Sequence, residues 1–244
     1  MSDKPLLVML HGWGANAGVW DDAVKNLAQD FEVVTPELPG HGESRSPAGD
    51  IETVARLIAQ QCDRPAIWLG WSLGALLALQ VALSAADKVS SLLLVSATPA
   101  FTQHAGWLDG MPADQLEAFR RDFMEQPERI LRRFFTLQGQ GDADAKQVAT
   151  RLNSILTGNI ENMAARLQWG LDVLRDADLR QTITKIEQPT RLLHGINDAI
   201  VPAGAGRYLA SVLGAEIQLW EEVGHAPFLS QPQHFIDWVR QAAA

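Results

Sequence analysis

The sequence predicts an α/β fold in which a mostly parallel sheet is flanked by helices and carries a helical insertion. Three observations predict it. Short apolar runs, typical of strands buried on both faces, alternate with amphipathic segments of helical period. A G-x-S-x-G motif at residues 70–74 joins one such run to a segment rich in alanine and leucine. Between residues 99 and 185 the apolar runs stop and helical periodicity remains.

The first part of the chain alternates between the two kinds of element. Strands are predicted at residues 6–10, 31–35, 66–70 and 91–96, and helices at 19–29, at 51–61 and directly after residue 72. This alternation predicts parallel strands joined by right-handed crossovers.

The second part begins with helices only and then returns to the sheet. Helices are predicted at residues 114–125, 127–138, 144–156 and 161–174, then strands at 190–194 and 215–220 and helices at 205–213 and 232–240. We therefore expect a core of residues 1–98 and 186–244 and a helical cap of residues 99–185 that covers the site.

The G-x-S-x-G motif is the strongest chemical signal in the chain. A serine in a strained turn between a strand and a helix crowds the backbone, so Gly70 and Gly74 leave room for it. Ser72 is then exposed at the edge of the sheet as a nucleophile, and the N–H group of Leu73 can face a developing oxyanion. The alternative is that Ser72 is a helix N-cap, for which serine is a favoured residue.

A nucleophilic serine needs a base and an acid that orients the base. His225 and Asp198 are the candidates because both follow predicted strands, as Ser72 does, and because the order Ser, Asp, His is typical of this constellation. His234 competes with His225 but lies in the predicted terminal helix. These three residues predict acyl transfer to water through an acyl-serine.

A second oxyanion donor is expected where the first strand ends. The segment from His11 to Gly14 follows that strand, and its glycines allow the backbone N–H near Trp13 to point into a cavity. The remaining histidines are expected to be structural; they are His11, His41, His104 and His194.

Composition excludes several other classes of function. The net charge of −9 argues against a nucleic-acid-binding surface, and no apolar run is long enough to span a membrane. No zinc-type cluster, G-x-G-x-x-G motif or P-loop is present, so we expect neither a metal nor a cofactor. The single Cys62 and the absence of a secretory signal favour a reducing cytoplasm.

The assembled pattern resembles the α/β-hydrolase family over nearly the whole chain. More closely, it is similar to the pimeloyl-acyl-carrier-protein methyl ester esterases of biotin synthesis. The motifs that carry this resemblance lie at residues 11–14, 70–74, 134–138, 178–181 and 224–228. The chain departs from that family in starting almost directly at the strand before His11, so we expect the family's leading strand to be shortened or lost here.

The resemblance implies an activity and partners. Enzymes of that family remove the methyl ester from a pimeloyl group on an acyl-carrier protein, which stops its elongation. By resemblance, the substrate contacts are Trp13, Ser72, Leu73, Phe134, Phe135, Thr136, Leu137, Gln138 and His225. The carrier contacts are Arg129 and Arg133, with Lys146 at a third position and Arg151 beside a fourth that is threonine here. We expect a monomer.

The charge pattern agrees with an acidic carrier. Residues 120–151 contain seven basic and five acidic side chains, whereas the rest of the chain contains 13 and 24. On the predicted helix 127–138 the arginines lie opposite the apolar residues. The alternative is an ordinary solvated helix face with pairs such as Glu125 and Arg129.

Other functions remain open on the same residues. A general short-chain carboxylesterase or a hydrolase of carbon–carbon bonds would use the same triad, and carrier dependence would separate them. A non-catalytic ligand receptor is a further alternative, which labelling by a fluorophosphonate would exclude.

Overall fold

The computed structural model describes residues 4–44, 49–155 and 160–243. Its six strands form a single sheet in the order β2-β1-β3-β4-β5-β6, and all five described strand pairings are parallel. The strands are β1 (Leu6–Leu10), β2 (Glu32–Val34), β3 (Ala66–Trp71), β4 (Val89–Val95), β5 (Thr190–Gly195) and β6 (Glu216–Trp220). The predicted α/β fold is confirmed.

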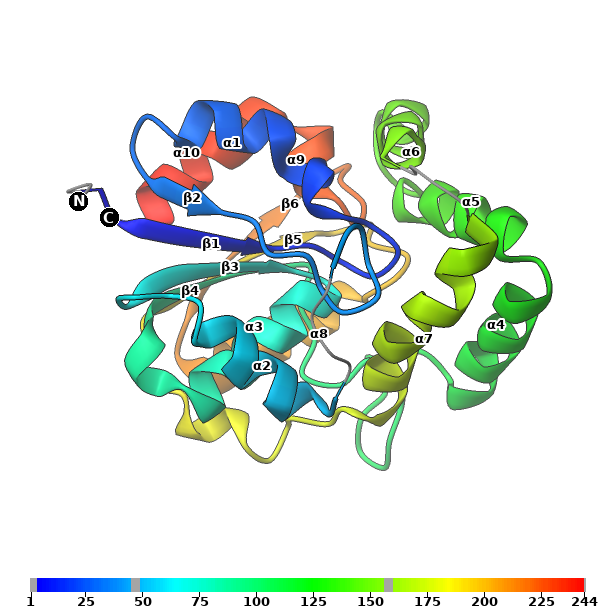
Figure 1. The fold of residues 1–244 in the computed structure, drawn as a ribbon, viewed down its shortest axis with the longest axis horizontal. Helices are drawn as coiled ribbons and strands as arrows, with labels where there is room; N and C mark the ends of the chain where they lie inside the picture. Colours follow the sequence, from blue (N-terminus) through cyan, green and yellow to red (C-terminus); the bar gives the residue numbers. More distant parts are fainter. Residues whose placement is uncertain (1–3, 45–48, 156–159, 244) are drawn as a thin grey trace.

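Helices cover both faces of the sheet (Figure 1). One face carries α1 (Asp21–Leu27) and α10 (Pro232–Ala242), and the other carries α2 (Ile51–Ala59), α3 (Leu73–Ser84) and α8 (Ala203–Leu213). The chain changes direction across the sheet at β1: β2 is added on one side of β1, and β3 and the later strands are added on the other. Ligands of open α/β sheets gather at such a switch point, outside the carboxyl ends of the strands.

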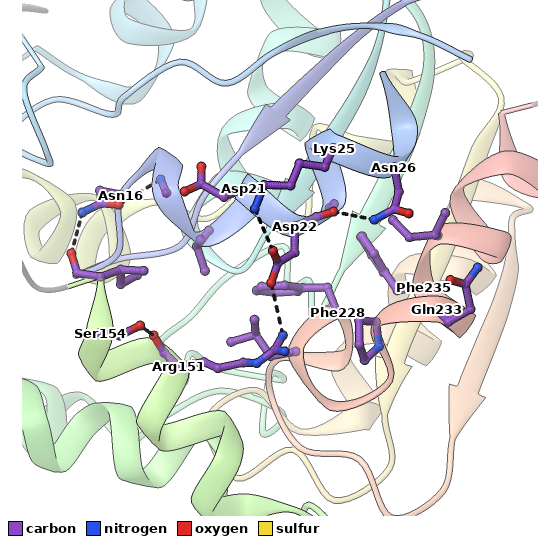
Figure 2. Close-up of a pocket in the computed structure, with 17 residues that line it drawn as sticks. Asn16, Asp21, Asp22, Lys25, Asn26, Arg151, Ser154, Phe228, Gln233 and Phe235 are labelled. Carbon is purple, nitrogen blue, oxygen red and sulfur yellow. Dashed lines mark hydrogen bonds and ion pairs between the residues drawn. The ribbon is translucent and has the colours of Figure 1, made fainter. Parts of the chain in front are cut away.

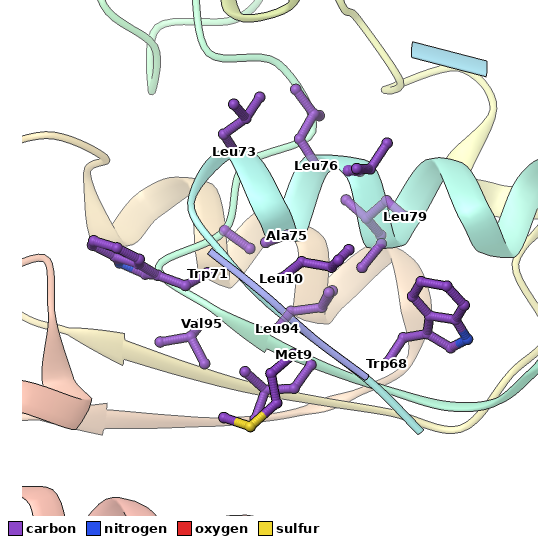
Figure 3. Close-up of a cluster of buried hydrophobic side chains, with 14 of the residues drawn as sticks. Met9, Leu10, Trp68, Trp71, Leu73, Ala75, Leu76, Leu79, Leu94 and Val95 are labelled. Atoms are coloured by element: carbon purple, nitrogen blue, oxygen red, sulfur yellow. The ribbon is translucent and has the colours of Figure 1, made fainter. Parts of the chain in front are cut away.

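The core is densest where α3 packs on β3 (Figure 3). All residues of α3 from Leu73 to Ala82 are buried, as expected for a helix that is apolar on every side. Trp68 and Trp71 lie near the two ends of β3, and both are buried completely. This packing fixes the turn between β3 and α3, which contains Ser72.

Four helices separate β4 from β5 and lie beyond the carboxyl ends of the strands (Figure 1). They are α4 (Ala113–Glu125), α5 (Pro127–Gln138), α6 (Ala145–Ser154) and α7 (Ile160–Asp176). Each corresponds to a predicted helix, and α5 has the predicted bounds. Residue 156, predicted as the end of the third helix, lies outside the described residues.

The structure differs from prediction at two short elements. The segment predicted as a helix from residue 19 begins as a 3₁₀ helix (Ala17–Trp20), because Asn16 caps it by accepting a hydrogen bond from the Gly18 N–H (2.9 Å). A four-residue helix, α9 (Pro227–Ser230), was not predicted. Four residues are too few to show helical periodicity.

A groove of about 590 Å³ separates α6 from α1 and α9 (Figure 2). Two polar links cross between α6 and the N-terminal segment. The guanidinium of Arg151 lies 3.6 Å from the Asp22 carboxylate, and the Asn16 side chain donates to the carbonyl of Ile155 (2.8 Å). The Arg151 side chain, expected to contact a carrier protein, is therefore paired with α1.

Candidate active site

Ser72 lies in the strained turn that its motif predicts. Its backbone angles are φ 57° and ψ −118°, in a region that residues other than glycine rarely adopt. A Cβ atom on Gly70 would lie 2.4 Å from the carbonyl oxygen of Gly74, and one on Gly74 would lie 2.3 Å from that of Leu10. Both glycines are therefore required by close backbone approach, as predicted.

Asp198 and His225 form a buried pair. Asp198 follows β5 and His225 follows β6, and the Nδ1–H of His225 donates to Oδ2 of Asp198 at 2.7 Å. The other carboxylate oxygen, Oδ1, accepts from the backbone N–H groups of Ile200 (2.8 Å) and Val201 (2.9 Å). The acid thus holds the imidazole with its Nε2 atom away from the carboxylate.

A second histidine completes the surroundings of the acid. His194 Nε2 lies 2.9 Å from the carbonyl oxygen of Val201 and 3.3 Å from Oδ2 of Asp198. A carbonyl only accepts, so the proton of His194 is on Nε2 and faces the carboxylate as well. All four lone-pair positions of Asp198 are then occupied.

The charge state of Asp198 follows from these contacts. Burial by itself would raise the pKa of this carboxyl group. The charge of His225 and the hydrogen bonds from His194 and His225 outweigh burial and hold the pKa well below its usual range. Asp198 is therefore ionised throughout the neutral pH range.

The backbone of His225 is held on both sides. Its carbonyl accepts from the indole N–H of Trp71 (2.8 Å) and from the hydroxyl of Ser96 (2.9 Å), and its N–H donates to the carbonyl of Gln138 (3.0 Å). The Trp71 ring, next to Ser72 in the chain, lies 5.6 Å from the imidazole. Among the described residues, Nε2 of His225 is buried without a hydrogen-bond partner.

The loop after β1 is oriented by His11. Nδ1 of His11 donates to the carbonyl of Gly12 (2.9 Å), because a carbonyl only accepts, and Nε2 lies 3.2 Å from the backbone nitrogen of Leu38 and 3.3 Å from the Glu37 carboxylate. In a trans peptide the carbonyl and the next N–H point in opposite directions. The N–H of Trp13 therefore points away from His11. A Cβ on Gly12 would lie 3.3 Å from Cβ of Ser72, so this loop borders the serine.

The remaining histidines lie apart from the triad. His41 is buried in the loop after β2, and burial together with the charge of His11 lowers its pKa to about 3. Its Nδ1 lies 3.0 Å from the carbonyl of Pro39, to which the neutral ring can donate. His234 is exposed and stacks on Trp220 at 4.1 Å.

An apolar cavity of about 70 Å³ borders Ser72. Ser72 supplies its only polar side-chain oxygen, and the other lining residues are Trp13, Phe101, Met111, Leu116, Phe119, Phe134, Leu137, Leu171, Leu174 and Ile200. The Trp13 ring is fixed by a hydrogen bond from its indole N–H to the carbonyl of Leu167 on α7 (3.0 Å).

Two of the five α5 residues expected to touch a substrate line this cavity, Phe134 and Leu137. Phe135 packs near Gly14 instead. Thr136 is exposed and donates to the carbonyl of Arg132 (3.0 Å), so the structure places it away from the cavity because the helical period turns it outward. Gln138 is buried and meets His225 through its carbonyl.

The expected carrier contacts lie on two helices. Arg129 and Arg133 on α5 and Lys146 on α6 are exposed. Arg129 donates to the side chain of Gln126 (2.8 Å), and not to Glu125 as in the alternative of an ordinary solvated helix face.

The sequence analysis did not single out two residues that contact the triad or the loops that carry it. His194 was expected to be merely structural, although its position four residues before Asp198 was a signal. Asp142, described below, had no signal, because it lies 56 residues before Asp198 in the chain.

Among the described residues, no group of three or more His, Cys, Asp or Glu side chains could hold a metal ion, and no helix is both long and apolar enough to cross a membrane.

Comparison with known proteins places this fold and site in a family. The sequence profile of the Alpha/beta hydrolase family matches residues 7–238, and the chain belongs to that family. Within it, the chain falls among the pimeloyl-[acyl-carrier protein] methyl ester esterases. The relative of that name from Nitrosomonas europaea is 39% identical over 95% of this chain and 93% of its own length. The one from Pectobacterium carotovorum is 38% identical over 96% and 92%.

A solved structure supports the same class. An esterase from Exiguobacterium antarcticum superposes with a TM-score of 0.88 and 26% sequence identity, over 100% of this chain and 94% of its own. The chain is accordingly an enzyme, a hydrolase of carboxylic esters.

Proposed function

We propose that this enzyme hydrolyses the methyl ester of pimeloyl-acyl-carrier protein, releasing methanol and leaving a free pimeloyl carboxylate on the carrier. The observation that carries the proposal is the shared name of curated relatives that are 35–39% identical to this chain over 93–98% of its length.

Ser72, His225 and Asp198 carry out the reaction in this proposal. The Oγ atom of Ser72 attacks the ester carbonyl carbon while Nε2 of His225 takes its proton. His225 then gives that proton to the departing methoxide, which leaves as methanol. Water attacks the acyl-serine with His225 again as the base. The bond between the acyl carbon and Oγ then breaks, His225 returns the proton to Oγ of Ser72, and the carboxylic acid leaves. The unpartnered Nε2 supports this role, since Asp198 already holds Nδ1.

The N–H groups of Trp13 and Leu73 stabilise the oxyanion. Leu73 is the first residue of α3, where N–H groups lack helical acceptors and the helix dipole favours negative charge. The Gly12 carbonyl is held by His11 and also accepts from the N–H of Ala15 (3.3 Å), so the peptide that carries the Trp13 N–H cannot turn freely.

The cavity at Ser72 takes the neutral end of the substrate. Its side chains offer no cation to a carboxylate, so a methyl ester is favoured over the charged product. We propose that residues 99–185 act as the cap that closes this cavity, with Phe134 and Leu137 against the acyl chain.

The carrier protein binds the outer face of the cap in this proposal. Arg129, Arg133 and Lys146 are exposed there, and no described residue forms an ion pair with Arg133. Charged surfaces of opposite sign steer association, so an acidic carrier would be attracted to this face and repelled elsewhere. We propose Arg151 only as a flanking residue, since Asp22 already pairs with it.

The reaction belongs to biotin synthesis in this proposal, and the enzyme acts as a cytoplasmic monomer without a cofactor or metal. Its partners are the carrier protein and small esters, and neither nucleic acid nor a membrane takes part.

The experiment is methanol release from methyl pimeloyl-carrier protein by the wild type, by Ser72→Ala and by Ser84→Ala. Ser84 is a matched control, because it lies at the other end of α3 and its hydroxyl donates to the Gln80 carbonyl. We expect Ser72→Ala to lower kcat by about four orders of magnitude or more and Ser84→Ala to change it little. Full activity of Ser72→Ala would refute the mechanism.

A further inference from the structure

The loop that joins α5 to α6 (residues 139–144) contacts both loops that carry the candidate acid and base. We propose that Asp142 in this loop is a positioning residue for His225. The proposal rests on the function proposed above, since it assigns a role in the same triad. Asp142 lies in the inserted segment, outside the sheet that carries the triad.

The carboxylate of Asp142 holds the chain before and after His225. Its Oδ2 atom accepts from the N–H of Gly224 (3.2 Å) and from the hydroxyl of Ser230 at the end of α9. Gly224 immediately precedes His225 in the chain. One oxygen atom therefore ties together the two ends of the segment from Gly224 to Ser230, which contains the base.

Three further contacts connect the same region to the triad loops. The Gln138 carbonyl accepts from the N–H of His225 (3.0 Å), and the N–H of Ala143 donates to the carbonyl of Glu222 (2.9 Å). The side chain of Asn197, next to Asp198, donates to the carbonyl of Gly141 (2.9 Å).

The close approach of the two loops depends on local backbone features. A Cβ on Gly224 would lie 2.9 Å from the Gln138 carbonyl oxygen and 3.0 Å from that of Gln140, so a larger residue would push the loops apart. Glu222 has φ 55°, a conformation that costs energy outside glycine and persists when its surroundings hold it. The Ala143 N–H supplies one of the bonds that hold it.

Loss of the Asp142 carboxylate is expected to affect the base more than substrate binding. The Trp71 and Ser96 side chains would still hold the His225 carbonyl, but the N–H of Gly224 would lose its acceptor. Asp142 does not line the cavity at Ser72. A small displacement of His225 would therefore lower kcat and leave KM largely unchanged.

The test compares Asp142→Ala, Asp142→Asn and Asp144→Ala on a soluble short-chain p-nitrophenyl ester. Asp144 is a matched control, because it lies in the same loop and its carboxylate accepts from the Gln147 N–H at the start of α6 (3.4 Å). We expect Asp142→Ala to lower kcat about tenfold, the range of a hydrogen bond to a charged group, with little change in KM. Asp142→Asn restores most of kcat, because its amide oxygen can accept the bonds from Gly224 and Ser230, while only the bond from the Asp144 N–H to Oδ1 (3.0 Å) is lost. Asp144→Ala keeps kcat within about twofold.

Backbone hydrogen exchange at residues 222–226 gives a second readout that needs no turnover. We expect faster exchange in Asp142→Ala than in Asp144→Ala, because local opening of the loop becomes easier. If Asp142→Ala does not fold, Ser230→Ala removes one of the two bonds and is expected to show the same changes to a smaller degree.

The proposal is overturned if Asp142→Ala keeps the wild-type kcat and exchange rates, or if Asp144→Ala loses as much as Asp142→Ala. Absence of wild-type activity on both this ester and methyl pimeloyl-carrier protein would refute the proposed function instead. The exchange comparison would then still decide whether Asp142 holds the loop.

Discussion

At the residue scale, the surroundings of Asp198 determine which imidazole nitrogen can act. The carboxylate receives two backbone N–H groups on one oxygen and two histidines on the other. With its hydrogen-bonding capacity filled, Asp198 neither rotates nor takes up a proton near neutral pH. It therefore fixes the Nδ1–H tautomer of His225 that the proposed mechanism needs.

Replacement of Asp198 by asparagine is expected to lower activity strongly. The kcat falls by about four orders of magnitude, because an amide can hold the wrong tautomer of His225. Assays of ester hydrolysis by Asp198→Asn measure this loss. A fall of less than about tenfold would contradict the assignment of Asp198 as the orienting acid.

The lowered pKa of Asp198 also makes a prediction for stability. A carboxyl group with a depressed pKa in the folded state stabilises the fold above its unfolded pKa of about 3.9, and this contribution is lost as the pH falls through the folded value. The difference in unfolding free energy between the wild type and Asp198→Asn is therefore largest at neutral pH and shrinks below about pH 4. Urea titrations at pH 7 and at pH 3 check this, and a difference that grows in acid would contradict it.

His194 is expected to support Asp198 through its Nε2–H. His194→Leu removes a hydrogen bond to a charged group, and we expect kcat to fall by about tenfold with little change in KM. His194→Gln, whose amide can donate from a similar place, recovers part of the loss. Equal kcat in the two variants and the wild type would show that His194 only fills space.

At the element scale, the strand–turn–helix around Ser72 was predictable because local rules and packing agree there. The motif required glycine at positions 70 and 74 because the backbone passes closely there. In the structure, an added Cβ atom at either position would meet neighbouring backbone atoms. The bounds of α5 were equally predictable, since Pro127 is favoured at a helix start and the apolar period is strong.

Other elements could not be predicted, because tertiary contacts decide them. Helix α9 has four residues and is held by the hydrogen bonds of Ser230 to Asp142 and to Ala226. The contacts of Asp142 with Gly224 and of Arg151 with α1 were not predictable, because they join segments 82 or more residues apart. Thr136 was expected beside the substrate because it belongs to a family motif of consecutive residues. Consecutive residues of a helix point to different sides, and Thr136 points away from the cavity.

The turn between β3 and α3, which contains Ser72, leads to a prediction about stability. Gly74→Ala places a Cβ atom 2.3 Å from the Leu10 carbonyl oxygen, and only backbone movement could relieve the clash. We expect it to cost more than about 3 kcal/mol of unfolding free energy or to prevent folding.

The matched control is Gly214→Ala at the end of α8. Gly214 has φ 59°, and an added Cβ would meet nothing within 4 Å, so only the left-handed conformation is penalised. We expect a loss of about 1–2 kcal/mol. Urea unfolding measures the free energy of unfolding of both variants. Equal losses would contradict the steric explanation for glycine in the turn between β3 and α3.

At the scale of the whole molecule, two features bear on the proposed carrier-linked substrate: the cavity at Ser72 and the distribution of charge. The cavity of about 70 Å³ at Ser72 is lined by apolar side chains, which suits the neutral methyl ester end of the substrate. The net charge of −9 repels an acidic carrier, whereas residues 120–151 have a surplus of basic side chains.

The most direct test of the central claim is kcat/KM on methyl pimeloyl-carrier protein beside a free short-chain methyl ester, each at low and at high salt. We predict that the carrier substrate is preferred and that its advantage shrinks as salt screens the basic residues of the cap. A preference for the free ester that does not depend on salt would contradict the carrier-linked function, while leaving ester hydrolysis at Ser72 intact.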